Sequence, residues 1–209
     1  MTTRQEEIKK LFLQNYANAK TELVYENLYE LLVSVMLSAQ CTDKRVNMIT
    51  PALFEQYPGV KELSKAKLQN VKKLIETCSF FNNKSKNLIS MATSVVEKFD
   101  SIIPMRKEEL VTLAGVGGKT ANVVLIEYNN ENLMAVDTHV FRTSYRLGLS
   151  RAKTVEATEK DLVRVFKTEL ATLHQAMVLF GRYICKAVKP DCAQCFMYNL
   201  CKSKDKIEI

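Results

Sequence analysis

Apolar residues recur along most of the chain at the three- and four-residue spacing of α-helices. The segment 27–38 is apolar almost all round, which predicts a helix buried on every side. Segments 67–76 and 84–99 keep their apolar residues near one face, as helices that cover a core do. Strand-like alternation is scarce, so we predict an all-α fold. Further helices are expected near residues 106–112, 118–128, 138–148, 154–169 and 171–185.

Local signals refine this pattern. Thr42 and Asp43 can cap the helix that follows them, and Pro51 predicts a kink or a re-start within it. The length of 209 residues suits one large domain or two small ones. The polar stretch 129–132 is the best candidate for a crossing between two domains.

Composition narrows the class of protein. The chain has 30 Lys+Arg against 23 Asp+Glu, a net charge of +7, which points weakly to a polyanionic partner. No apolar stretch of about 20 residues is present, so we expect no membrane span. The N-terminal segment is charged and lacks an apolar signal core, so a cytoplasmic location is expected, nucleoid-associated in a prokaryote. In that compartment the six cysteines favour a metal site over disulfides.

The segment LVTLAGVGGKTANVVL at 110–125 predicts the end of one helix, a tight turn and the start of another. Gly115 and Gly117 suit a backbone with positive φ or a close approach to a ligand. The unbonded amides at the start of the second helix can bind a phosphate. Val116 can point into the core and lock the turn. An ordinary helix–turn–helix corner would show the same glycines, so they leave both interpretations open.

Lys119 falls in the first turn of this second helix. The helix dipole disfavours a protonated amine there, and a neutral amine is what nucleophilic attack requires. A lysine that only pairs with phosphate or solvent remains an alternative. The residues between Gly118 and Asp137 are long enough to return the chain to the helix start, so Asp137 can lie beside Lys119. Asp137 also suits an N-cap, and one carboxylate can fill both roles.

Four cysteines near the C-terminus have the spacing C-x6-C-x2-C-x5-C and can close a tetrahedral metal site. They are Cys185, Cys192, Cys195 and Cys201. Ligand chemistry allows zinc or an iron–sulfur cluster and favours zinc. Lys186 and Lys189 lie between the first two ligands, where they either contact phosphate or are merely solvated. Cys41 and Cys78 are expected to be small buried residues.

Together, LAGVGGKTANVVL, AVDTHVFR and the cysteine spacing resemble the endonuclease III family of helix-hairpin-helix DNA glycosylases. MLSAQCTDKRVN at 36–47 resembles the family's LLSAQ-x-TD segment. The resemblance covers the chain from about Thr21 to the C-terminus. It implies an all-α fold of two domains with a DNA cleft between them: a six-helix bundle at 22–131 with the hairpin, and an iron–sulfur domain of residues 1–21 and 132–209. It also implies a [4Fe–4S] cluster in place of zinc.

The resemblance further implies a bifunctional DNA glycosylase/AP lyase that removes oxidised pyrimidines from duplex DNA. Lys119 would be the nucleophile and Asp137 the activating carboxylate, and β-elimination through a lysine Schiff base would cut the strand. Gln40 would fill the gap left by the extruded base, and Phe80 would be the apolar wedge. The implied DNA-binding residues are Gln40, Phe80, Gly115, Gly117, Gly118, Lys186 and Lys189; the implied metal ligands are the four C-terminal cysteines.

The chain departs from the family pattern at four places near DNA. Ala114 replaces a proline, Gly118 a basic residue, Phe80 the leucine of a Gly-Leu-Tyr sequence, and Asp191 a basic residue in the cysteine loop. None of these changes affects Lys119 or Asp137.

Three other functions are alternatives for this sequence. A non-catalytic module that binds damaged DNA would use the hairpin and cysteines only as a scaffold. An adenine glycosylase would lack the lysine, and a small iron–sulfur electron carrier would leave most of the chain without a role. An enzyme of this size can act on DNA as a monomer.

Overall fold

The computed structural model describes residues 1–207, and within that range every regular element is a helix. The predicted all-α fold is therefore confirmed. None of the described helices is both long enough and apolar enough to cross a membrane. In chain order the helices are α1 (Thr3–Asn15), α2 (Leu28–Ser38), α3 (Asp43–Gln56), α4 (Val60–Ser64), α5 (Leu68–Leu74), α6 (Phe81–Lys98), α7 (Lys107–Leu110), α8 (Gly118–Asn129), α9 (Thr138–Arg146), α10 (Val155–Phe166), α11 (Leu170–Tyr183) and the 3-10 helix η1 (Tyr198–Leu200).

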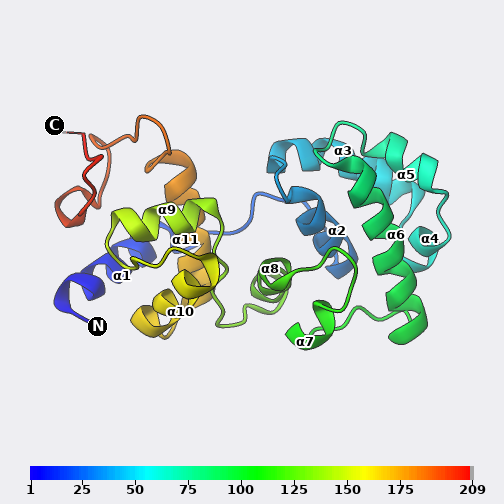
Figure 1. The fold of residues 1–209 in the computed structure, drawn as a ribbon, viewed down its shortest axis with the longest axis horizontal. Coiled ribbons are helices and arrows are strands. Elements are labelled where there is room, and N and C mark those ends of the chain that lie inside the picture. Colours follow the sequence, from blue (N-terminus) through cyan, green and yellow to red (C-terminus); the bar gives the residue numbers. More distant parts are fainter. Residues whose placement is uncertain (208–209) are drawn as a thin grey trace. The chain divides into compact units, whose positions relative to one another are not determined.

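The chain divides into two compact units (Figure 1). The hairpin unit is Glu22–Asn129 and contains α2 to α8. The cysteine unit joins Met1–Thr21 to the chain from Asn130 onward and contains α1, α9 to α11 and η1. Each unit has its own set of packed helices.

Helix α2 is the centre of the hairpin unit. Leu31, Leu32 and Leu37 have no exposed surface. The helix packs against α3, α6 and α8. This burial confirms the expectation drawn from its all-round apolar pattern, because a helix without a polar face must be covered by neighbours on every side. Asn27 begins the helix as an N-cap, since its side chain accepts a hydrogen bond from the Glu30 N–H at 3.0 Å.

Helix α3 begins as predicted but does not re-start at its proline. The Thr42 hydroxyl accepts a hydrogen bond from the Arg45 N–H at 3.2 Å, which confirms the cap. The predicted re-start at Pro51 is wrong, because α3 continues through it to Gln56. Pro51 is exposed. Its ring therefore lies on the solvent side, where water can satisfy a backbone carbonyl that the proline leaves unbonded.

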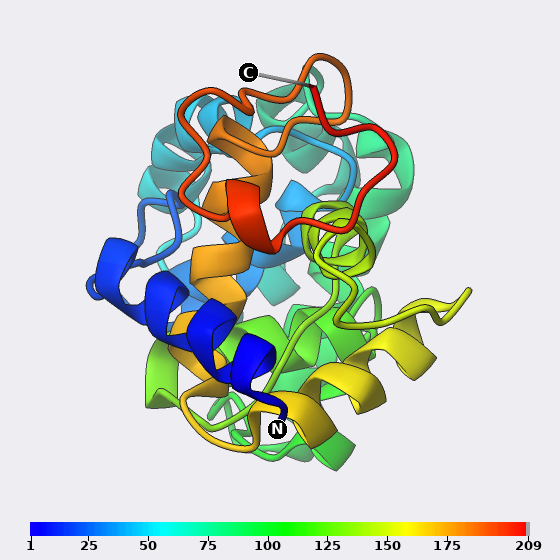
Figure 2. The same ribbon diagram turned by 90° about the vertical axis from the view of Figure 1, so that its left-hand side faces the viewer.

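The cysteine unit builds its core around aromatic side chains. Ile8 and Phe12 of α1 are fully buried, and the Phe12 ring lies 5.4 Å from the Phe180 ring of α11 and 6.2 Å from the Phe196 ring. Helices α1 and α9 both pack against α11 (Figure 1). From α11 to residue 207 the chain runs as loops with one short 3-10 turn (Figure 2).

Three helices of this unit end earlier than the sequence predicts. Helix α9 ends at Arg146 rather than near residue 148. Helix α10 ends at Phe166 rather than near residue 169, because Lys167 and Glu169 both have a positive φ of 63°, which no helical residue has. Helix α11 ends at Tyr183 rather than at Cys185. Cys185 thus lies just beyond the helix, in the loop that carries the other cysteines.

Candidate functional site

The turn between α7 and α8 requires a glycine at position 115. Gly115 has φ of +79°, in the left-handed region. A Cβ there would lie 2.9 Å from the Asn87 Cβ and 3.1 Å from the Met36 Cε. Val116 is 5% exposed, so it locks the turn into the core as predicted. Backbone conformation and close packing on α2 and α6 therefore both fix this corner.

Gly117 and Gly118, unlike Gly115, are not required by backbone conformation or by packing. Neither has positive φ, and a Cβ on either would meet nothing within 4 Å. The first hydrogen bond of α8 runs from the Ala121 N–H to the Gly117 carbonyl, so the amides of the preceding turn lie at a bare, exposed surface. Lys119 is exposed in that turn. This surface leaves room for a phosphate backbone to approach closely.

Asp137 is the N-cap of α9. Its Oδ1 accepts a hydrogen bond from the Val140 N–H at 2.7 Å, and its backbone is extended. The capping role predicted from the sequence is confirmed. Asp137 belongs to the cysteine unit and Lys119 to the hairpin unit, and the catalytic roles of both stay predictions.

Gln40 and Phe80 occupy two exposed loops with unusual backbone. Gln40 follows α2 with φ of 54°, and Phe80 precedes α6 with φ of 59° and 62% exposure. The buried Lys84 of α6 donates from Nζ to the carbonyls of Leu37 at 2.8 Å and Ala39 at 2.7 Å. Lys84 therefore ties the end of α2 to the start of α6 and holds the two loops together.

Sequence reasoning missed the part played by Lys84. In α6 this lysine shares the buried face with Leu88, Met91 and Val95, at the spacing of a helical stripe. A lysine on an apolar stripe is the signal that could have revealed it, because a buried ammonium needs several acceptors.

The four C-terminal cysteines line one cavity in the cysteine unit. Among residues 1–207, no three His, Cys, Asp or Glu side chains converge as the ligands of a single ion do. Burial raises the pKa of the Cys195 thiol to about 11, and repulsion from Cys185 and Cys201 acts in the same direction. Buried thiols that lie close together lose their protons only when a metal cation binds them as thiolates. Four thiols around one cavity are a donor set that an iron–sulfur cluster accepts.

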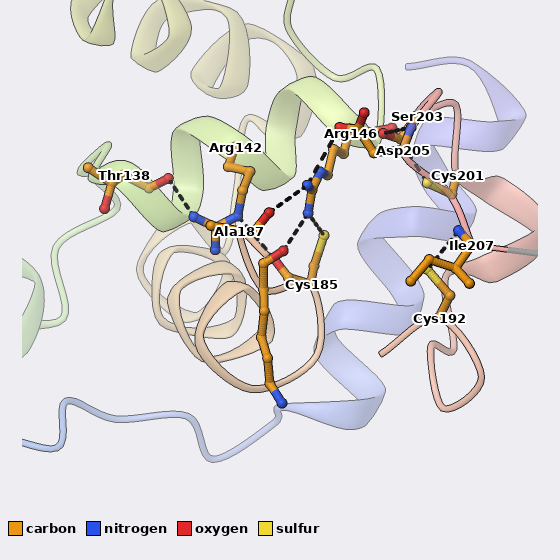
Figure 3. Close-up of polar contacts among 11 residues, drawn as sticks. Thr138, Arg142, Arg146, Cys185, Ala187, Cys192, Cys201, Ser203, Asp205 and Ile207 are labelled. Carbon is orange, nitrogen blue, oxygen red and sulfur yellow. Dashed lines mark hydrogen bonds and ion pairs between the residues drawn. The ribbon is translucent and has the colours of Figure 1, made fainter. Parts of the chain in front are cut away.

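Two arginines of α9 hold the loop that begins at Cys185 (Figure 3). Arg146 Nη1 donates to the Cys185 Sγ at 3.5 Å and to the Lys186 carbonyl at 2.6 Å, and Nη2 donates to the Ala187 carbonyl at 3.2 Å. Arg142 Nε donates to the Cys185 carbonyl at 3.0 Å. Sequence reasoning missed both arginines, although their four-residue spacing places them on one helix face.

The loop between the first two cysteines exposes its lysines. Lys186 and Lys189 both face solvent, and Lys189 has φ of 49°. Asp191 has a structural role, since its Oδ1 accepts a hydrogen bond from the Gln194 N–H at 3.3 Å. This bond supports the turn that carries Cys192 and Cys195. Contact of the lysines with phosphate stays a prediction.

Two family models match this chain, one over most of its helices and one over its C-terminal cysteines. Residues 33–168 match the HhH-GPD superfamily of base excision DNA repair proteins, and residues 185–201 match the iron–sulfur binding domain of endonuclease III. The chain is thus a helix-hairpin-helix protein with an iron–sulfur domain.

Individual proteins of known family also match this chain along most of its length. The chain is 43% identical to endonuclease III of Rickettsia felis, over 93% of this chain and 92% of that protein. It is 42% identical to endonuclease III of Synechocystis sp., over 96% of this chain and 92% of that one. A solved structure of a trapped endonuclease III–DNA covalent intermediate matches with a TM-score of 0.91 at 37% identity and covers 97% of each chain. This protein belongs to the endonuclease III family and is a DNA glycosylase and AP lyase of base excision repair that acts on DNA.

Family membership also decides the cofactor. The preference for zinc drawn from ligand chemistry is wrong, and the [4Fe–4S] assignment is confirmed. Cys185, Cys192, Cys195 and Cys201 are the residues that would hold the cluster. When bound, such a cluster cross-links an otherwise irregular segment through iron–thiolate bonds.

Proposed function

We propose that this enzyme excises oxidised pyrimidines from duplex DNA and then cuts the abasic strand by β-elimination. Its family and the exposed Lys119 in the first turn of α8 support this proposal. A glycosylase without such a lysine would use water and could not cut the strand by this route. The relatives are bacterial, which supports work in the cytoplasm at the nucleoid.

Lys119 is the nucleophile in this proposal. The target nucleotide leaves the base stack, so that its C1′ becomes accessible. The neutral amine attacks C1′, and the base departs with the electrons of the glycosidic bond. The ammonium that forms loses one proton, and opening of the sugar ring, with a proton taken up by its O4′, gives a protonated Schiff base. Removal of a 2′ proton then expels the 3′ phosphate, which breaks the strand. Lys119 is regenerated when water hydrolyses the Schiff base.

Asp137 is the partner carboxylate. One of its oxygens is committed to the Val140 N–H, which fixes the orientation of the carboxylate group. The group can accept the proton that the attacking amine releases and stabilise positive charge on the sugar. Because Asp137 comes from the cysteine unit, we propose that catalysis uses the domains 22–131 and 1–21 with 132–209 together.

The remaining predicted residues bind DNA. Gln40 fills the space left by the extruded nucleotide, and Phe80 wedges beside it; both are exposed in loops held by Lys84. The bare surface at Gly117 and Gly118 receives a phosphate, and so do Lys186 and Lys189. These assignments are supported by exposure and backbone geometry.

A cleavage panel tests the proposed substrate class. Duplexes with thymine glycol, 5-hydroxycytosine, uracil or an abasic site are incubated with the holoenzyme, and strand scission is measured. We expect cleavage at the two oxidised pyrimidines and at the abasic site, but not at uracil. Binding of the abasic duplex without cleavage would favour the non-catalytic module instead.

A further inference from the structure

The two cysteines outside the cluster lie in the loops that carry Gln40 and Phe80. Cys41 directly follows Gln40, and Cys78 lies two residues before Phe80. Cys78 is 2% exposed, whereas Cys41 is partly exposed. The Cys78 Sγ donates a hydrogen bond to the Leu37 carbonyl at 3.5 Å, which places it against the loop that carries Cys41, and the neighbouring Cys41 thiol helps burial to raise the pKa of Cys78.

Their surroundings hold both thiols in place. Lys84 Nζ donates to the Cys78 Sγ at 3.3 Å and to the Ala39 carbonyl at 2.7 Å, so one ammonium contacts both loops. The Cys41 N–H donates to the Ser38 carbonyl at 3.0 Å. Burial raises the pKa of the Cys78 thiol, and Lys84 opposes that effect. A thiol beside an ammonium becomes a thiolate more easily than one in a purely apolar site.

We propose that Cys41 and Cys78 form a reversible disulfide when the protein meets a peroxide. The Cys41 thiolate attacks one peroxide oxygen, which gives a sulfenic acid and, after protonation, one water. The Cys78 sulfur, held beside Lys84, then attacks the Cys41 sulfur while the Cys78 proton passes to the departing oxygen, which leaves as the second water. Overall the two thiols give up two protons and two electrons, and the peroxide is reduced to two waters.

The cross-link joins the two loops covalently. A disulfide holds its sulfur atoms only about 2.05 Å apart, much closer than two unbonded thiols can lie, so its formation must draw Cys41 and Cys78 together. Gln40 is adjacent to Cys41 and moves with it, which changes its position relative to Phe80. We expect weaker binding of damaged DNA in the oxidised protein. This consequence rests on the proposed DNA role of Gln40 and Phe80, whereas the disulfide chemistry does not.

Peptide mapping tests the chemistry. The holoprotein is treated with hydrogen peroxide, with visible absorption as a check on the cluster, and digested with trypsin without reductant. The proposal predicts a linked pair of peptides, 21–44 and 74–84, that has lost the mass of two hydrogen atoms and separates with dithiothreitol. Separate peptides with a sulfinic acid on Cys41, or a link that joins Cys78 to Lys84 through an added oxygen, would overturn it.

DNA binding tests the consequence. The probe is a duplex with an uncleavable tetrahydrofuran abasic site. Oxidised wild-type protein should bind it about threefold more weakly or worse. Dithiothreitol should restore binding, and Cys41→Ser should not respond to peroxide. A disulfide without any change in affinity would overturn the consequence. A reduced protein that binds no abasic duplex would instead contradict the proposed function.

Discussion

The Arg146 guanidinium donates a hydrogen bond to the Cys185 Sγ at 3.5 Å and pairs with the Asp205 carboxylate at 3.5 Å (Figure 3). Arg146 is 8% exposed, so its charge is held mainly by these groups and by loop carbonyls. One side chain of α9 thereby links the helix that Asp137 caps to the first cluster ligand. The position of the cluster loop thus depends on α9 as well as on its own metal.

Replacing Arg146 should loosen the cluster. Arg146→Met keeps much of the volume but removes the bonds to Cys185 and Lys186, at a cost of about 3 kcal/mol. We expect less iron per chain and faster bleaching of visible absorption. Arg164→Met is the matched control, because Arg164 is an exposed arginine that pairs with Asp161 on the surface. Equal iron content and bleaching rates in the two variants would contradict this role.

The hairpin glycines should respond differently to alanine. Gly115→Ala places a Cβ 2.9 Å from Asn87 at positive φ, so we expect a loss of about 1–2 kcal/mol and a lower Tm. Gly117→Ala meets nothing within 4 Å and should keep the Tm of the wild type while it weakens DNA binding. Thermal unfolding and binding to an abasic duplex measure both effects. A drop in Tm for Gly117→Ala would show that the site is structural.

Lys84 should matter for stability and for DNA binding alike. Lys84→Met removes the donor shared by the Leu37 and Ala39 carbonyls, which costs about 2–4 kcal/mol and frees the Gln40 loop. We expect a lower Tm and weaker binding of an abasic duplex. The exposed Lys86 on the same helix supplies the control, Lys86→Met, whose Tm should not change. If Lys84→Met binds DNA as tightly as the control does, Lys84 does not support the DNA-binding loop.

Asp137 can be tested by separating its two roles. Asp137→Asn keeps an oxygen for the Val140 N–H, so stability should be retained while base excision falls about 100-fold or more. Asp137→Ala loses the cap as well, at about 1 kcal/mol. Unfolding curves and single-turnover excision rates distinguish the variants. Full activity in Asp137→Asn would leave the residue with a capping role alone.

The sequence predicted what depends on local pattern. Apolar spacing located the helices, the all-apolar run located the buried α2, and Asp137 was recognised as a cap. It did not predict that α10 ends at Phe166, because Lys167 and Glu169 adopt a positive φ that their residue types do not favour. Long-range polar contacts were also missed.

Lys84 and Arg146 illustrate that limit. Lys84 donates to carbonyls 45 and 47 positions away, and Arg146 to loop atoms 39 to 41 positions away. Such contacts exist only once the chain has folded. Ligand chemistry likewise could not distinguish an iron–sulfur cluster from zinc, because four thiolates bind either one.

Borohydride trapping on an abasic duplex examines Lys119 itself. Reduction of the Schiff base should leave a stable protein–DNA adduct, and trypsin should then yield peptide 108–142 uncut at Lys119 and carrying the sugar remnant. Lys119→Gln should give no adduct, while Lys61→Gln, a change at an exposed lysine of α4, should trap as the wild type does. An adduct on a different lysine, or one that persists in Lys119→Gln, would contradict the assignment of the nucleophile.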